Sequence, residues 1–191
     1  MKKLIAIMLA LLLCGAALAE GAFPEGIAWG MSPDEVVALE GEDACERFPV
    51  EDGMEIVTRA GVSVEPFGGV EANLNCVFRA DQLALCGYGF DSSDLDIDGA
   101  LAALTGLYGE PTDSDFANMM ELRSLLMGVP DESAGEGLEE GAFYAGWTLE
   151  DGIYLILTDN YGSVEVAWFE TNLIHALAGG GLGEPAPALD D

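Results

Sequence analysis

The stretch that decides the fold runs from residue 71 to residue 90 and reads EANLNCVFRADQLALCGYGF. Before the short centre Ala80-Asp81-Gln82, apolar residues alternate with mostly polar ones, and after it the run from Leu83 to Phe90 is apolar with glycines at alternate positions. This alternation is typical of two half-buried antiparallel strands joined by a tight turn. A three-residue loop would pair Arg79 with Leu83 and would place the apolar residues of both strands on one face. Slipping the register by one residue would mix the two faces, so the pattern predicts this hairpin in this register.

The predicted register also sets Cys76 opposite Cys86, at a Cβ separation that allows a cross-strand disulfide. We therefore predict a Cys76–Cys86 disulfide, with two small buried thiols as the alternative, since cysteine is common in cores. Cys45 is then left over. No Cys-x-x-Cys motif occurs, which disfavours a thiol redox enzyme. The only histidine, His175, stands near the C-terminus, which disfavours a zinc site.

More strands are predicted on either side of the hairpin. They are rich in Val, Ile, Tyr, Phe and Trp and are bounded by turn residues, as half-buried antiparallel strands are. With the hairpin included, the predicted strands are Met54–Val64, Glu71–Arg79, Leu83–Phe90, Ala142–Leu149, Ile153–Thr158 and Ser163–Phe169. Trp147 and Trp168 lie at alternating positions and are expected in the core. The strand Ile153–Thr158 is apolar on both sides, so either a helix covers its second side or that side is a partner surface.

Two helices are predicted from their caps and stops. In the first, Ser32 caps the helix, Pro33 takes the first helical position and Glu35 completes a capping box. The second helix has one apolar face at helical spacing and stops at Gly109. That face is made of Ile97, Leu101, Leu104 and Tyr108. A short third helix is expected within Asp115–Met127.

Each of the two capped helices precedes a block of strands at a similar spacing, which suggests a repeated unit. We therefore predict an α+β fold of two tandem helix-plus-antiparallel β-meander units, with the helices packed on one face of the sheet. The units span residues 20–92 and 93–178. Residues 179–191 are expected to form a disordered acidic tail, and Val129–Glu140 an exposed acidic loop.

The first residues are typical of a secretory signal peptide, residues 1–19. Lys2 and Lys3 give the positive start, an unbroken apolar run follows from Leu4 to Leu13, and Ala17-Leu18-Ala19 is a small-x-small cleavage site. Cys14 offers lipidation as an alternative, but a lipobox needs a small residue before the cysteine, and here a leucine precedes it. The apolar run is too short for a bilayer, which takes about 20 residues. We expect a secreted or periplasmic protein with no membrane span.

The composition is extremely acidic. The chain has 35 Asp and Glu against 6 Lys and Arg, and its formal net charge is −29. Cleavage of the signal peptide would remove both lysines and leave only four arginines as basic residues. Such a charge repels nucleic acid and anionic lipid, and it attracts divalent cations and basic proteins. Nucleic-acid binding is therefore excluded as a function class.

A run of alternating aspartates, Asp94, Asp96 and Asp98, is the sharpest local motif. Calcium loops use this spacing because alternate carboxylates converge on one hard cation and a following glycine makes the sharp turn. An EF-hand is disfavoured because its twelfth position is Thr105, where a bidentate acid is needed. The competing hypothesis is that Asp96 or Asp98 caps the second helix. Capping is favoured because Ile97 already belongs to that helix's apolar face, and calcium is kept as the alternative.

The sequence offers few sets of residues that could form a catalytic site. A Ser-His-acid triad would depend on His175, which stands at a chain end without rigid support. Carboxylate pairs for glycoside hydrolysis are so numerous that none can be singled out. We therefore expect a non-catalytic binding module for a protein partner. The alternatives are a calcium-binding or calcium-stabilised domain and a small hydrolase that uses acidic residues.

Two short motifs also resemble known families. The start Trp29-Gly30-Met31-Ser32, and the helix end Leu107-Tyr108-Gly109-Glu110-Pro111 before an antiparallel sheet, are similar to those of small exported bacterial domains. The layout resembles the β-lactamase-inhibitory-protein-like and SmpA/OmlA-like families. This resemblance implies a binding scaffold that offers a sheet surface to a protein partner, and it carries over no individual binding residue.

Overall fold

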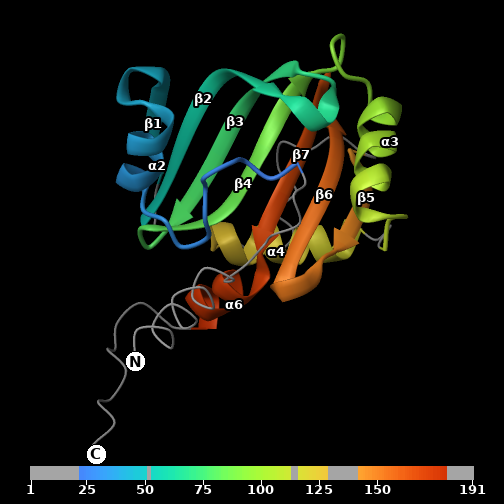
Figure 1. Ribbon diagram of the computed structural model, residues 1–191. Coiled ribbons are helices and arrows are strands. Elements are labelled where there is room, and N and C mark those ends of the chain that lie inside the picture. Colours follow the sequence, from blue (N-terminus) through green and yellow to red (C-terminus); the bar gives the residue numbers. More distant parts are fainter. Residues whose placement is uncertain (1–21, 51–52, 113–115, 129–141, 180–191) are drawn as a thin grey trace, which may run out of the picture.

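The computed structural model describes residues 22–50, 53–112, 116–128 and 142–179 (Figure 1). The predicted signal peptide with Cys14, the acidic loop Val129–Glu140 and the predicted tail beyond Gly179 lie outside these ranges. Among the helices within these ranges, none is long and apolar enough to cross a membrane.

Seven strands form one antiparallel sheet in the order β1-β2-β3-β4-β7-β6-β5 (Figure 1). Their bounds are Cys45–Val50 (β1), Met54–Val64 (β2), Val70–Arg79 (β3), Gln82–Asp91 (β4), Phe143–Thr148 (β5), Ile153–Asn160 (β6) and Ser163–Glu170 (β7). The first four strands form one meander and the last three another, and the two meanders meet where β4 pairs with β7. The predicted α+β class with antiparallel meanders is confirmed, and every strand except β1 was predicted.

β1 was missed because it is an exposed edge strand. Every residue after Cys45 in this strand is exposed, so burial imposes no apolar alternation on its sequence. The strand contains Glu46, Arg47 and Pro49. Charged residues and proline are typical of edge strands, where they discourage pairing with other chains. Read without its neighbours, such a segment has the composition of a loop.

The described chain contains four α-helices: Pro33–Glu40 (α2), Ile97–Tyr108 (α3), Phe116–Met127 (α4) and Thr171–Gly179 (α6). Short 3-10 turns lie at Glu42–Ala44, Glu65–Phe67 and Glu150–Gly152. The capping box of α2 is formed as predicted, because the Ser32 hydroxyl accepts from the Glu35 N–H and the Glu35 carboxylate accepts from the Ser32 N–H. α6 was not predicted. It forms because Ile174, only 1% exposed, packs against the sheet.

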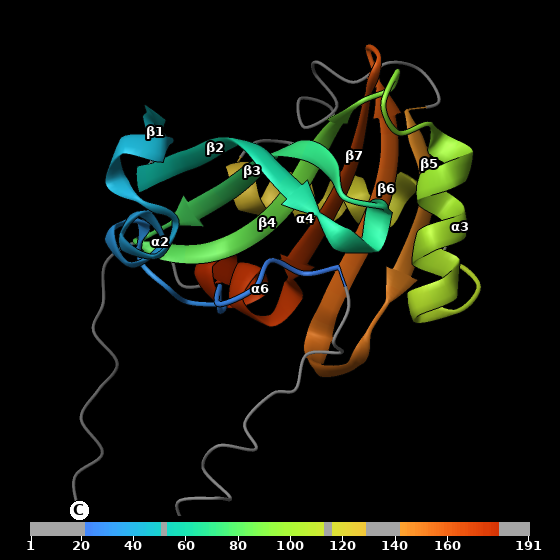
Figure 2. The same cartoon turned by 45° about the horizontal axis from the view of Figure 1, so that its top comes forward.

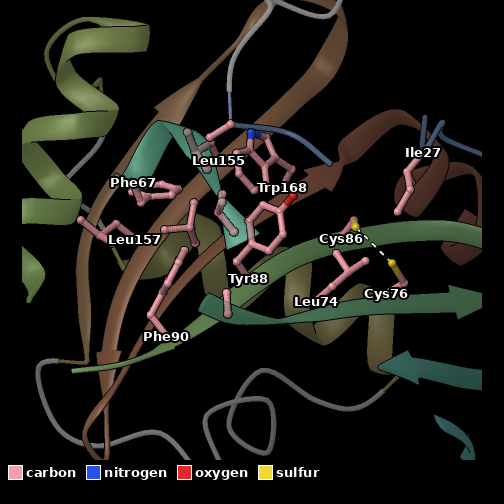
Figure 3. Close-up of a cluster of buried hydrophobic side chains, with 14 of the residues drawn as sticks. Ile27, Phe67, Leu74, Cys76, Cys86, Tyr88, Phe90, Leu155, Leu157 and Trp168 are labelled. Atoms are coloured by element: carbon pink, nitrogen blue, oxygen red, sulfur yellow. Dashed lines mark hydrogen bonds between the residues drawn. The ribbon is translucent and has the colours of Figure 1, made fainter. Parts of the chain in front are cut away.

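The helices divide between the two faces of the sheet, which corrects the prediction that they share one. α2, α3 and the segment 22–31 pack on the first face, over a core that includes Tyr88, Phe90, Leu155 and Trp168 (Figure 3). α4 and α6 pack on the second face, and α4 runs behind the strands in Figures 1 and 2. The second side of β6 is thus covered by helices, one of the two alternatives that its apolar pattern left open.

The β3–β4 hairpin has a shorter turn than predicted. Arg79 pairs with Gln82 instead of Leu83, because Ala80 and Asp81 both adopt positive φ, 48° and 64°, in a two-residue turn. This is the backbone form that matches the twist of the flanking strands. A bulge at Ala84 then restores the predicted register. It also turns Leu83 toward the first face and Ala84 toward the second.

The predicted opposition of Cys76 and Cys86 is confirmed. The two residues are direct cross-strand partners, both fully buried, and their Sγ atoms lie 3.1 Å apart as thiols (Figure 3). Burial raises the pKa of the Cys86 thiol well above its ordinary value, and the neighbouring Cys76 adds to this. Cys45 is half-buried. The covalent bond between Cys76 and Cys86 stays a prediction.

Candidate binding site

A row of apolar residues crosses the second face of the sheet from one edge almost to the other. It consists of direct cross-strand partners and runs Phe48, Ile56, Val77, Leu85, Phe169 and Tyr154. Its two ends differ in burial. Phe169 and Tyr154 lie under α4 and α6 and are almost fully buried, whereas Phe48 is 46% exposed and Ile56 is half-buried. The β1–β2 end of this face is therefore an accessible apolar surface.

Next to Phe48, the neighbouring pair Val50 and Met54 extends this surface along β1 and β2. Val50 is 39% exposed and Met54 is half-buried. We call the residues Phe48, Val50, Met54, Ile56 and Val77 the open patch. Exposed apolar surface of this kind is typical of interaction sites when it is contiguous.

A groove of about 370 Å³ continues from the open patch toward the centre of the same face. The strands β2, β3, β4, β6 and β7 form its floor, and α4 forms its wall. The wall consists of Met119, Arg123, Leu126 and Met127, which recur at helical spacing. Gly87 lies in this floor and adds no side chain to fill the groove. No larger residue fits at this position, because a Cβ would lie 2.5 Å from the Val166 carbonyl oxygen.

Arg79 holds the wall of the groove in place. Its guanidinium donates to the Leu125 carbonyl at 2.6 Å and also to the Leu126 carbonyl. These carbonyls belong to the last turn of α4, where the helix leaves acceptors unpaired and where a cation is favoured by the helix dipole. Arg79 ends β3, so this contact fixes the C-terminal end of α4 beside the β3–β4 hairpin.

Four polar side chains interrupt the apolar lining of the groove: Asn75, Arg123, Thr158 and Glu165. Thr158 and Glu165 are direct cross-strand partners on β6 and β7. Glu165 keeps an exposed surface at the rim of the groove. Even so, partial desolvation by its surroundings raises the pKa of its carboxyl above the ordinary value, and the guanidinium of Arg123 acts in the opposite direction. The carboxyl is thus less readily ionised than a fully hydrated one.

Thr158 is the unusual member of this group. It is only 2% exposed, and its Oγ1 has no hydrogen-bond partner among the residues that the structure describes. A buried hydroxyl without a partner costs about 1–3 kcal/mol of folding free energy. Buried polar groups are normally paired, so an unpaired hydroxyl requires an explanation. One explanation is a binding site in which a polar group of a bound partner pairs with the hydroxyl.

The aspartates of the predicted calcium run have individual roles. Asp96 is the N-cap of α3, and its Oδ1 accepts from the Gly99 N–H at 2.7 Å, so the capping hypothesis is confirmed for this residue. Asp98 Oδ1 accepts from the Tyr144 hydroxyl at 3.3 Å, and the charge of Asp98 raises the pKa of that tyrosine. Asp94 lies in the turn before the helix. Within the described ranges, no three His, Cys, Asp or Glu side chains are arranged to hold a metal ion.

His175 lies in a second, smaller hollow of about 230 Å³ between α4, α6 and the β5–β6 turn. The hollow also contains Glu121 and Thr171. The Thr171 hydroxyl donates to the Gly152 carbonyl at 2.6 Å. Because this proton is already engaged, Thr171 is not arranged as a nucleophile beside the histidine. The tryptophans predicted in the core, Trp147 and Trp168, are at most 1% exposed and are confirmed there.

The groove was not predicted from the sequence, although its polar residues left a signal. Thr158 follows Tyr154 and Ile156 at alternate positions of β6, and Glu165 precedes Ala167 and Phe169 in the same way on β7. Each is thus a polar residue on a side of its strand that is otherwise apolar. Locating the site also required the position of α4, which sequence periodicity does not give.

No protein-family model, curated protein or solved structure matches this chain. The resemblance to small exported bacterial domains therefore stays a prediction from the sequence.

Proposed function

We propose that this protein is an exported, non-catalytic binding module that docks a protein partner on the open patch. The observation that carries the proposal is the apolar row on the second face, which is buried under α4 and α6 at one end and accessible at Phe48 and Ile56. An apolar surface beside a shaped groove offers both buried area and a pocket for an anchoring side chain, as interaction sites do.

The two edges of the sheet also favour this end. At the β5 edge, the Thr148 N–H donates to Thr112 Oγ1 at 2.7 Å, and the Thr112 N–H donates to the Gly146 carbonyl at 2.9 Å. A segment of the chain thus lies along β5. β1, by contrast, is exposed along nearly its whole length. A partner that approaches the open patch therefore meets an accessible edge as well as an apolar face.

Charge selects the kind of partner. With a formal net charge of −29 for the whole chain, two copies repel each other, which opposes self-association through this surface. The same charge steers a basic protein toward the molecule and raises its association rate. The proposed partner is therefore a basic protein, and the apolar contacts of the open patch hold it once it arrives.

The alternatives have less support from the geometry. A calcium-stabilised domain would need the carboxylate of Asp96, which instead caps α3. A hydrolase would need a placed nucleophile or acid pair, and the hollow beside His175 has its Thr171 hydroxyl engaged with a backbone carbonyl. No specific observation favours either function over partner binding.

The proposal is tested by removing apolar surface without changing charge. The double variant Phe48→Ser, Val50→Ser should lose the partners that the wild-type mature protein retains from an extract of the producing cells. The control is Leu107→Ser, because Leu107 is 41% exposed on α3, away from the open patch. The control should retain the same partners as wild type. Equal retention by all three proteins would refute the proposal.

A further inference from the structure

We propose that the groove beside the open patch receives an arginine side chain of the partner, with Glu165 and Thr158 as the acceptors at its polar end. This inference rests on the proposed docking function and specifies its anchor. Arginine is among the residues that contribute most to binding at interfaces, and it does so in desolvated pockets.

The polar end of the groove offers acceptors that suit a guanidinium. Glu165 provides a carboxylate and its cross-strand partner Thr158 a hydroxyl oxygen, which has no partner among the described residues. Asn75 lies on the same face, and its Nδ2 donates to the Asn73 carbonyl at 3.4 Å. Arginine has five N–H donors in a fixed planar arrangement and no acceptor. It therefore matches the Glu165 carboxylate and the Thr158 hydroxyl oxygen, both of which can accept.

The apolar part of the groove suits the rest of such a side chain. Arginine buries its aliphatic stem along apolar surface while its charged head meets polar groups. Met54, Met119 and Met127 line the groove, and methionine adapts its shape to different occupants. A volume of about 370 Å³ is at the low end of the range of about 300–1,000 Å³ for ligand sites. It leaves room for an apolar residue next to the arginine.

Charge also favours a cation over an anion in this groove. The strongly negative molecule repels anions at long range. Within the groove, the charge of Arg123 acts on Glu165 and partly offsets the upward shift of its pKa. An entering guanidinium would meet the positive charge of Arg123 as well as the Glu165 carboxylate. Arg123 should therefore weaken the binding of a cation, and removing its charge should strengthen it.

The experiment uses two short peptides and the mature protein with ¹³C-labelled methionine methyl groups. The probe is N-acetyl-Leu-Arg-amide, and its control is N-acetyl-Leu-citrulline-amide, in which the side chain has nearly the same shape without the charge. NMR titration should shift the methyl signals of Met54, Met119 and Met127. The signal of Met31, which packs on the first face, should not move. The citrulline peptide should bind at least about tenfold more weakly, the scale of a hydrogen bond to a charged group.

Variants separate this anchor from general attraction by charge. Glu165→Gln and Thr158→Val should each weaken the arginine peptide, by about tenfold and several-fold, and Arg123→Gln should tighten it. Glu25→Gln removes the same charge from a residue that does not line the groove and should leave the affinity within about twofold of wild type. Equal binding of the two peptides, or equal effects of Glu165→Gln and Glu25→Gln, would overturn the arginine anchor. Neither result would bear on the docking function, which the open-patch variant tests separately.

Discussion

Replacing Thr158 by valine should make the protein more stable. The two side chains have nearly the same shape, so valine fills the same space in β6 and differs only in replacing the hydroxyl by a methyl group. Thr158 is 2% exposed, and its Oγ1 has no hydrogen-bond partner within the described structure. Folding therefore takes this hydroxyl from water without returning a hydrogen bond, which costs about 1–3 kcal/mol. The variant no longer bears that cost.

The expected gain is about 1–2 kcal/mol, because a relaxed side chain recovers part of the cost. For a domain of this size, 1 kcal/mol shifts Tm by about 2–4 °C, so we expect Tm to rise by about 2–8 °C. Thr171→Val is the matched control. The Thr171 hydroxyl donates to the Gly152 carbonyl at 2.6 Å, and its removal should lower the free energy of unfolding by about 1 kcal/mol.

The assay is urea unfolding of the two variants and the wild type, with thermal melts as a second measurement. Opposite signs for the same substitution at the two positions would support the hydrogen-bond assignments. A loss of stability in Thr158→Val of the same size as in Thr171→Val would refute the reasoning. It would mean that the Thr158 hydroxyl has a partner in solution.

Three further predictions concern other parts of the molecule. In the mature protein, which lacks Cys14, the predicted Cys76–Cys86 disulfide should leave one alkylatable thiol, Cys45, and its reduction should cost about 2.7 kcal/mol for a loop of 10 residues. Three alkylated thiols under denaturing, non-reducing conditions would contradict this. Arg79→Ala should destabilise the protein by about 1.5–3 kcal/mol and speed amide exchange in the last turn of α4, whereas unchanged exchange there would show that the arginine does not hold the helix. Glu165→Gln should be more stable than wild type at pH 7, and the difference should vanish near pH 4. The reason is the raised pKa of Glu165, because of which the folded wild type loses stability as the pH rises from the unfolded pKa through the folded pKa. Urea unfolding across this pH range checks the prediction, and a constant difference would show that ionisation is not the cause.

Local signals in the sequence predicted most of the fold. The capping box at Ser32 and Glu35 depends on neighbouring residues only, and it was found directly. The pairing of Cys76 with Cys86 followed from apolar alternation, which holds because one face of the hairpin is buried. The length of its turn did not follow, because a bulge at Ala84 compensates for the shorter loop. Two different turn lengths therefore give the same cysteine pairing.

What could not be predicted depends on tertiary contacts. β1 has no buried face, and α6 forms because Ile174 packs against a sheet made by distant segments. The assignment of α4 and α6 to the second face also depends on that packing. The groove arises where α4 crosses the sheet, so Thr158 and Glu165 become neighbours of Arg123 only in the folded chain. Their polar character on an otherwise apolar side of each strand was the one signal visible beforehand.

The most direct test of the central claim is photo-crosslinking from the open patch. A photoreactive amino acid replaces Phe48 in one sample and Leu107 in another, and both proteins are irradiated in an extract of the producing cells. The two positions are similarly exposed, 46% and 41%, and lie on β1 and on α3. We predict a covalent adduct with a basic protein from position 48 and none from position 107. Adducts of equal yield from both positions, or from position 107 alone, would contradict the claim that the open patch is the docking surface.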